Sequence, residues 1–171
     1  YAALLLRRSY TDLALPGALM DRAKEWLMPT DAKWRESAKT WSFPSGATLT
    51  FGYLERPGDE YRYQSTEFQF VGFDELTQFE EAHYRYMFSR LRRRLDSSAA
   101  LRMRSASNPG GIGHEWVRGR FIDADPSDGE RVFIAARLPD NPYLDQDAYV
   151  QSLNQLDPVT RRQLLQGDWT A

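Results

Sequence analysis

The feature that most constrains this chain is a mostly apolar run, FQFVGF at residues 68 to 73, which ends in two adjacent carboxylates, Asp74 and Glu75. A short apolar and aromatic run of this kind predicts a buried strand. Two acids at the end of a buried strand need an explanation, because burial disfavours an ionised carboxylate unless something compensates its charge. A metal ion, a proton or the start of a helix can each do so.

Further segments have the composition of strands. Three short runs are predicted as strands, at residues 2–7, 101–107 and 131–138. A β-hairpin is predicted at residues 40–54, with its turn at Pro44-Ser45-Gly46. Strands that alternate with helices, each strand an apolar run, are typical of a mostly parallel sheet covered on both faces. We therefore expect an α/β fold in a single domain, residues 1–171, whose sheet is flanked by helices and carries a β-hairpin insertion.

Helices are predicted between these strands. One runs from about Thr11 to Trp26, although a Pro-Gly pair interrupts its first turns. Another runs from Thr77 to about Arg94, with Glu80 able to complete a capping box at its start. Later helices are expected at residues 114–122, 145–156 and 158–166.

Polar segments follow two of the predicted strands. Asp74 and Glu75 come directly after residues 68–73, and SASNPGG, residues 105–111, follows the strand that begins near residue 101. Sheets of this type bind ligands just beyond the carboxyl ends of their strands. The two segments are therefore expected at one edge of the sheet, where serine and asparagine could bind a phosphate or a water. A plain strand-to-helix turn would use the same residue types.

The amino-acid composition excludes several classes of protein. The net charge is −2, and 19 of the 22 cationic side chains are arginine, the residue preferred for phosphate recognition. The overall acidity argues against a chain that coats nucleic acid non-specifically, although local basic patches remain possible. The absence of cysteine excludes disulfides and thiolate metal sites. No apolar run approaches the roughly 20 residues that span a bilayer, so no membrane partner is expected.

An apolar strand ending in Asp-Glu matches the Walker B motif of P-loop ATPases. In those enzymes the aspartate holds Mg²⁺, usually through water, and the glutamate polarises the water that attacks the γ-phosphate. The alternative is that Asp74 or Glu75 caps the helix predicted from Thr77. No G-x-x-x-x-G-K-[ST] motif occurs in these residues, so either the ATPase interpretation is wrong or the chain starts after that motif. The apolar strand at the N-terminus favours the second possibility. We therefore expect the chain to be an excised piece of a longer protein.

Several sequence blocks, taken together, resemble the ATPase (motor) domain of tailed-bacteriophage terminase large subunits, the enzymes that package DNA into procapsids. They cover nearly the whole chain in the family's order, and they are LLLRRSYTDL, FPSGATLTFGYL, YQSTEFQFVGFDELTQF, RMRSASNPGGIGHEWVRGRFI, LPDNPYLDQDAYVQSLNQL and RRQLLQGDW. The resemblance implies a RecA-like P-loop ATPase core that is N-terminally truncated. It would lack the family's upstream P-loop and downstream nuclease domain.

The resemblance also implies roles for individual residues. Asp74 would hold Mg²⁺ and Glu75 would be the catalytic carboxylate. The coupling motif, which senses the nucleotide state and passes it to DNA-moving elements, would be formed by Ser105, Ala106, Ser107, Asn108 and Pro109.

Arginines are the candidate contacts to DNA or to a neighbouring subunit. They are Arg7 and Arg8 after the first strand, Arg62 near the position of an arginine finger in some relatives, and Arg90, Arg93 and Arg94 on one predicted helical face. The alternative for the last three is a solvated face that pairs with Glu80, Glu81 or Asp96.

The resemblance implies a motor that hydrolyses ATP with Mg²⁺ and drives double-stranded DNA into the procapsid. Expected partners are DNA, the portal protein, the small terminase subunit and further copies of the chain in a ring. The expected location is the host cytoplasm, transiently on the procapsid. Two alternatives remain: a metal-dependent DNA nuclease that uses Asp74 and Glu75 as ligands, and a non-catalytic domain that binds DNA or the small terminase subunit.

Overall fold

The computed structural model describes residues 1–125, 127, 129 and 131–171. They divide into two compact units. Unit 1 comprises Tyr1–Glu75 and Ala82–Ala106, and unit 2 comprises Leu76–Glu81 and Ser107–Ala171. Within the described ranges, no helix has both the length and the apolar character needed to cross a bilayer.

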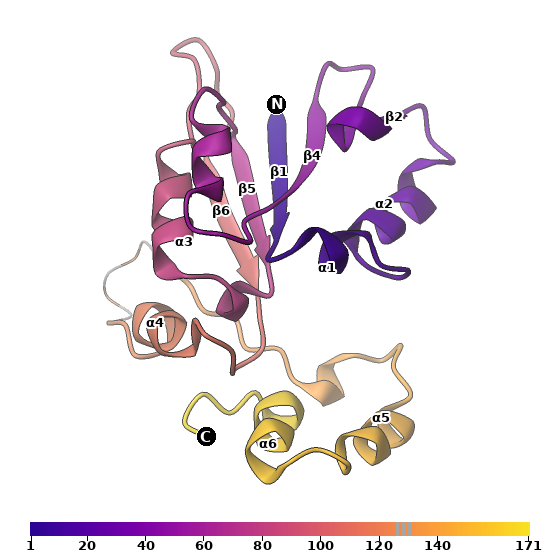
Figure 1. Cartoon of the computed structure of the whole chain (residues 1–171), viewed down its shortest axis with the longest axis vertical. Helices are drawn as coiled ribbons and strands as arrows, with labels where there is room; N and C mark the ends of the chain where they lie inside the picture. Colours follow the sequence, from indigo (N-terminus) through magenta and orange to yellow (C-terminus); the bar gives the residue numbers. More distant parts are fainter. Residues whose placement is uncertain (126, 128, 130) are drawn as a thin grey trace. The chain divides into compact units, whose positions relative to one another are not determined.

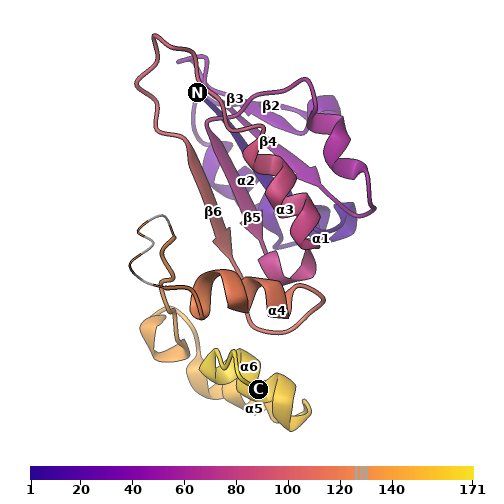
Figure 2. The same ribbon diagram turned by 90° about the vertical axis from the view of Figure 1, so that its left-hand side faces the viewer.

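Unit 1 contains a six-stranded sheet with the order β2-β3-β4-β1-β5-β6. Its strands are β1 (Ala2–Arg7), β2 (Lys33–Arg35), β3 (Thr40–Ser42), β4 (Thr48–Tyr53), β5 (Phe70–Asp74) and β6 (Arg102–Ala106). β1 is parallel to both β4 and β5, and β5 is parallel to β6 (Figure 2), whereas β3 is antiparallel to β2 and β4. The prediction of an α/β fold with a mostly parallel sheet is confirmed.

Helices lie on both faces of this sheet. Figure 1 shows α1 (Tyr10–Ala14) and α2 (Leu19–Leu27) on one side and α3 (Glu81–Phe88) on the other. On the first face, helix side chains including Leu13 join Trp41 and Phe51 of the sheet in one buried cluster. On the second, the rings of Phe73 and Tyr84 lie 5.3 Å apart. Strands covered on both faces bury all their side chains, which is why β5 is an almost continuous apolar run.

The β-hairpin prediction is confirmed. β3 and β4 pair antiparallel with Trp41 opposite Leu49, and Gly46 in the connecting turn has a φ of 82°. The additional antiparallel strand β2 places Trp34 beside Trp41, with ring centroids 5.3 Å apart. β2 was not predicted from the sequence, because three residues of mixed polarity have no clear strand pattern.

The helix predicted over residues 11–26 is divided in two. Ser9, and not Thr11, caps α1, since its Oγ accepts a hydrogen bond from the backbone N–H of Asp12 at 3.1 Å. The chain leaves the helical conformation at Leu15, whose ψ is 151°, directly before Pro16, and Gly17 then has a φ of 78°. These residues end the first helix and separate it from α2.

The helix predicted from Thr77 to Arg94 is wrong at both ends. α3 begins only at Glu81 and ends at Phe88. Beyond it the chain turns and runs beside the start of β5, where Phe68 N–H donates to the Arg90 carbonyl at 2.9 Å and Arg92 N–H donates to the Phe68 carbonyl at 3.0 Å. Arg93 and Arg94 therefore lie in a loop and do not share a helical face with Arg90.

Unit 2 is built from short helices and turns. They are η3 (Leu76–Gln78), α4 (His114–Val117), the π-helical turn η4 (Arg118–Ile122), η6 (Leu138–Asp140), α5 (Gln146–Leu153) and α6 (Pro158–Gln166). Asp145 and Asp157 cap α5 and α6, and Gly167 ends α6 with a φ of 61°. The helices predicted near residues 114, 145 and 158 are confirmed.

The strand predicted over residues 131–138 is wrong. Residues 131–137 have no regular secondary structure, and Leu138 begins η6. One aromatic residue of this run, Phe133, packs edge-on against Trp169 at 6.3 Å between ring centroids. A strand needs a partner strand for its backbone hydrogen bonds, and no described strand pairs with this segment.

Candidate active site

The acid pair begins at the carboxyl end of β5. Asp74 is the last residue of that strand and lies in register with Ala106, the last residue of β6. Arg7, the last residue of β1, lies beside it, with its Nε 2.5 Å from Oδ2 of Asp74. Three parallel strands therefore bring a carboxylate, its guanidinium partner and the start of the 105–109 segment to one edge of the sheet, as predicted for the two polar segments.

Glu75 has an unusual backbone conformation. Its φ is 58°, in the left-handed region, and among the described residues other than glycine only Lys39 shares this property. A left-handed conformation costs an L-residue with a side chain roughly 1 to 2 kcal/mol. Strained residues of this kind cluster at functional sites, where the surrounding structure holds them in place. The left-handed residue follows β5 directly, so the extended conformation of the strand ends at Asp74.

The acid pair does not cap α3. A capping residue directly precedes the first turn of its helix, whereas α3 begins at Glu81, well after Asp74 and Glu75. Glu80 does not form the expected capping box with Thr77 either, because Thr77 lies inside the 3₁₀ turn η3 and its hydroxyl has other partners.

Those partners belong to the segment that follows β6. Within unit 2, the backbone N–H of Thr77 donates to Ser107 Oγ at 3.0 Å, and the two hydroxyl oxygens are 2.9 Å apart. The Thr77 hydroxyl also donates to the carbonyl oxygen of Asn108 at 3.0 Å. Only 1% of Thr77 is exposed to solvent. The turn that follows Glu75 is therefore tied to the loop of the predicted coupling motif through buried hydroxyl groups.

The glycines of this loop strengthen the connection. Gly113 N–H donates to the Thr77 carbonyl at 2.7 Å, and Trp116 Nε1–H donates to the Phe79 carbonyl at 2.9 Å. A Cβ at Gly113 would lie 2.6 Å from that same Phe79 oxygen. Only glycine allows the two backbones to approach this closely. These contacts were not predicted, because a threonine followed three residues later by a glutamate also matches the capping-box pattern of a helix N-terminus.

His114 has a structural role in unit 2, in agreement with its lack of any metal-ligand spacing. Its Nδ1 accepts a hydrogen bond from Gly110 N–H at 2.8 Å. Its ring stacks on Trp169 with centroids 5.4 Å apart. The ring thus holds the glycine loop against the C-terminal segment.

The other candidate arginines are engaged in different ways. Arg8 donates from Nη1 to the carbonyl of Leu54. Arg62 forms an ion pair with Asp59 at 2.5 Å, and its guanidinium carbon lies 4.7 Å from the centre of the Tyr53 ring.

Arg90 is buried, with 7% of its surface exposed. Its Nη1 donates to the carbonyl oxygens of Tyr63 and Gln64, and its guanidinium lies 5.5 Å from the centre of the Tyr86 ring. Arg93 and Arg94, in contrast, are exposed. Arg90 therefore joins α3 to the segment before β5, with Nη1 bonded to backbone carbonyls and Nε donating to Ser89 Oγ at 3.0 Å.

The donors at this edge fit a nucleotide-bound Mg²⁺ better than a metal cage made by protein alone. In the part of the chain that the structure describes, no three His, Asp or Glu side chains are grouped so that they could hold a metal. Asp74 and Glu75 supply two adjacent, half-buried carboxylates. Mg²⁺ in proteins is usually held by one or two carboxylates, with water and substrate phosphates completing its octahedral shell. Asp74 and Glu75 are the carboxylates at this edge that could hold such an ion.

Solved structures with the same fold are large terminases of a thermophilic bacteriophage. One matches with a TM-score of 0.75 at 15% sequence identity, and a complex with ADP matches with a TM-score of 0.73 at 14% identity. A complex with ATP-γ-S matches with a TM-score of 0.69 at 17% identity. Each match covers 98% of this chain, which spans only about 40% of the length of those structures.

A comparison with curated proteins found no match. The family model described as "Terminase large subunit, T4likevirus-type, N-terminal" matches residues 4–171, almost the entire chain. The chain therefore belongs to the family of phage terminase large subunits and corresponds to the N-terminal part of its T4likevirus-type members.

Proposed function

We propose that this chain is the ATPase part of a DNA-packaging motor, which couples hydrolysis of Mg-ATP to translocation of double-stranded DNA into a procapsid. The observation that carries the proposal is the acid pair at the end of β5. Asp74 is held by Arg7, and Glu75 follows it in a strained left-handed conformation. The family match and the nucleotide complexes of the thermophilic phage's terminase support the same reaction class.

The two carboxylates would divide the chemistry between them. Asp74 would hold a Mg²⁺ ion, which when bound would supply positive charge to stabilise the phosphates as they react. Glu75 would accept a hydrogen bond from a water molecule, orient it towards the γ-phosphate and favour removal of its proton. Adjacent carboxylates would serve different atoms here, because Asp74 ends β5 whereas Glu75 has a left-handed backbone conformation.

The neighbouring groups would position these carboxylates. Arg7 would orient Asp74 and balance its charge when no nucleotide is bound. The coupling role of residues 105–109 rests on two features. Ser105 and Ala106 end β6 beside β5, and Ser107 and Asn108 hydrogen-bond to Thr77. A change at the phosphates would alter the turn after Glu75 and reach the loop through these hydroxyl groups.

The family assignment supports a set of partners for the intact protein. We propose double-stranded DNA as the substrate that is moved, and the portal protein, the small terminase subunit and further copies of the chain in a ring as the partners in assembly. The proposed location is the host cytoplasm, on the procapsid during packaging. Among the candidate contacts, Arg62 is exposed and belongs to the turn η2 (Asp59–Tyr63), where a neighbouring subunit could reach it.

The test is steady-state Mg²⁺-dependent ATP hydrolysis by the intact large subunit, with Glu75→Gln as the variant. The substitution keeps the size of the side chain but removes the negative charge that activates water, so we expect a loss of at least roughly 100-fold in kcat with nucleotide binding retained. Unchanged hydrolysis combined with lost DNA cleavage would instead favour the metal-dependent nuclease. DNA binding by a wild-type protein with no ATPase would favour a non-catalytic binding domain.

A further inference from the structure

Positive charge is concentrated between the end of α3 and the end of β6. Residues 89–104 contain six arginines and one acidic residue, Asp96, in a chain whose net charge is −2. The acid pair lies at the carboxyl end of β5, whereas this basic segment reaches β6 from the opposite, amino end. The basic segment therefore begins at the opposite end of these strands from the acid pair.

Two of the arginines share a face of the sheet. Arg102 and Arg104 are two residues apart in β6, so their side chains project to the same side. Their neighbours in β5 are Phe70 and Gly72. The alternate residues of β5 face α3, as the contact of Phe73 with Tyr84 shows. Arg102 and Arg104 consequently project from the sheet face opposite α3, and both are exposed.

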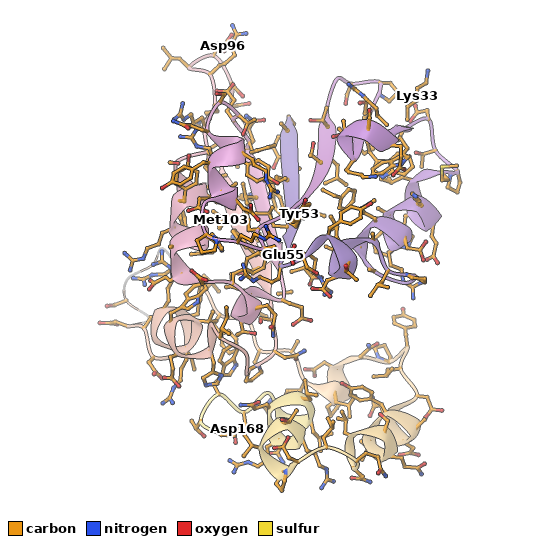
Figure 3. The ribbon with its side chains drawn as sticks, in the orientation of Figure 1. Lys33, Tyr53, Glu55, Asp96, Met103 and Asp168 are labelled. Carbon is orange, nitrogen blue, oxygen red and sulfur yellow. The ribbon has the colours of Figure 1, made fainter. Side chains whose placement is uncertain are left out.

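A glutamine brings the loop arginines next to this strand. The side-chain amide of Gln69 donates to the carbonyl of Arg92 at 2.8 Å, and the backbone carbonyl of Gln69 accepts from Arg102 N–H at 2.9 Å. The loop is closed by Arg93, whose Nη1 donates to the carbonyl of Ala99 at 2.9 Å. Figure 3 labels Asp96 in this loop and Met103 in β6. We define the arginine patch as Arg92, Arg93, Arg94, Arg102 and Arg104.

The arginine patch has few internal partners. In the described parts of the chain, no carboxylate pairs with four of its members, and their hydrogen bonds, where present, go to backbone carbonyls. Arg94 pairs with Asp96 at 3.3 Å, but both side chains are about three-quarters exposed, and such surface pairs contribute little. Arg90 is not part of the patch because it is buried. An exposed group of like charges without counter-charges is repulsive, so it requires an external anion to become favourable.

We propose that the arginine patch binds the sugar-phosphate backbone of double-stranded DNA. Guanidinium groups match phosphate oxygens in geometry, and an array of closely spaced arginines can neutralise several phosphates of one duplex. Contacts to phosphate carry no sequence information, which suits a protein that must move along any sequence. The identification of the anion as duplex DNA rests on the proposed function.

The test measures binding of the intact large subunit to a fluorescent duplex of about 30 base pairs over a range of salt concentrations. The variant is Arg102→Gln/Arg104→Gln, and the control is Arg56→Gln/Arg161→Gln, which removes the same charge from exposed arginines outside the patch. Each lost phosphate contact lowers the slope of log K against log salt by about one. We expect the patch variant to bind more weakly at each salt concentration, with a slope reduced by about two, and the control to retain the wild-type slope.

A third protein, Arg102→Lys/Arg104→Lys, keeps the charge. It tests whether weaker binding by the glutamine variant comes from lost charge or from misfolding. It should retain most of the slope. Equal slopes for wild type and the glutamine variant would overturn the proposal, as would equal losses for the glutamine variant and the control. ATP hydrolysis by the wild-type protein is measured separately, so a failure of the proposed motor function appears there and not in the salt dependence of DNA binding.

Discussion

The Nε atom of Arg7 lies 2.5 Å from Oδ2 of Asp74, so an ion pair joins the last residue of β1 to the last residue of β5. Their side chains remain 25% and 26% exposed, and a pair this accessible contributes less than about 1 kcal/mol to folding. Its main effect is to orient a carboxylate at the site of the proposed chemistry. Partners that orient metal-binding side chains commonly affect activity more than stability.

Replacement of this guanidinium should therefore affect the reaction. We expect Arg7→Gln to lower Mg²⁺-dependent ATP hydrolysis by about 10- to 100-fold and to raise the Mg²⁺ concentration needed for half-maximal rate. Magnesium titration of the steady-state rate measures both. Arg22→Gln is the matched control, since it breaks an exposed ion pair with Glu25 in α2 and should leave the rate unchanged. Equal rates of ATP hydrolysis for wild type and Arg7→Gln would contradict the proposal that Arg7 positions Asp74.

The left-handed conformation of Glu75 makes an unusual prediction for stability. Glycine adopts a positive φ without the steric cost that a Cβ brings. The free energy of unfolding of Glu75→Gly should therefore exceed that of Glu75→Ala by about 1 kcal/mol, although both variants lose the carboxylate and should lose ATP hydrolysis. Urea denaturation of the two variants provides the comparison. If the alanine variant were as stable as the glycine variant, Glu75 would not be strained in the protein.

The buried hydroxyl pair of Thr77 and Ser107 should behave as one unit. Thr77→Val keeps the shape but removes the hydrogen bonds that the Thr77 hydroxyl makes with Ser107 and with the Asn108 carbonyl, which should cost about 1 to 3 kcal/mol. Ser107→Ala should cost about 1 kcal/mol, and the double variant should lose less than the sum, because the shared hydrogen bond can be removed only once. Thermal or urea unfolding measures all three. Strict additivity would show that the two hydroxyl groups act independently.

Tyr63 provides a test at high pH. Burial raises the pKa of its phenol from the ordinary value of 10.0 to about 12. A raised pKa means that the folded protein retains the proton longer than the unfolded chain does. The associated stability is complete below about pH 10 and is lost as the pH rises through about 12. Absorbance titration at the tyrosinate band should show one phenol that loses its proton near pH 12 in the wild type and is missing in Tyr63→Phe. Identical titration curves of the two proteins around pH 12 would contradict the burial of Tyr63.

The parallel strands and the position of the acid pair were predictable because they rest on local patterns. FQFVGF before Asp74 and AALLLR at the start of the chain are apolar over most of the length of a strand, and burial on both sheet faces requires such runs. The turn at Pro44-Ser45-Gly46 likewise carries its own signal, since a glycine there can adopt a positive φ.

The failures have one common physical cause, which is that long-range contacts decide between equivalent local patterns. The run RVFIAARL has the composition of a strand, yet no described strand pairs with residues 131–137. Thr77 and Glu80 satisfy the capping-box pattern, yet the threonine hydroxyl binds Ser107 and Asn108, which lie 30 and 31 residues further along the chain. Local sequence could not distinguish these outcomes, because the competing partner is distant in sequence. The strain at Glu75 and the pairing of Arg7 with Asp74 were invisible for the same reason.

The strand order has a consequence for how the protein folds. β1 comes first along the chain but lies inside the sheet, where Ala3 pairs with Leu49 of β4 on one side and with Phe70 of β5 on the other. Neither side of β1 can be completed until residues far downstream have been synthesised, and parallel pairing over such separations is slow. The ion pair of Arg7 with Asp74 can therefore form only after β1 and β5 have paired in the sheet.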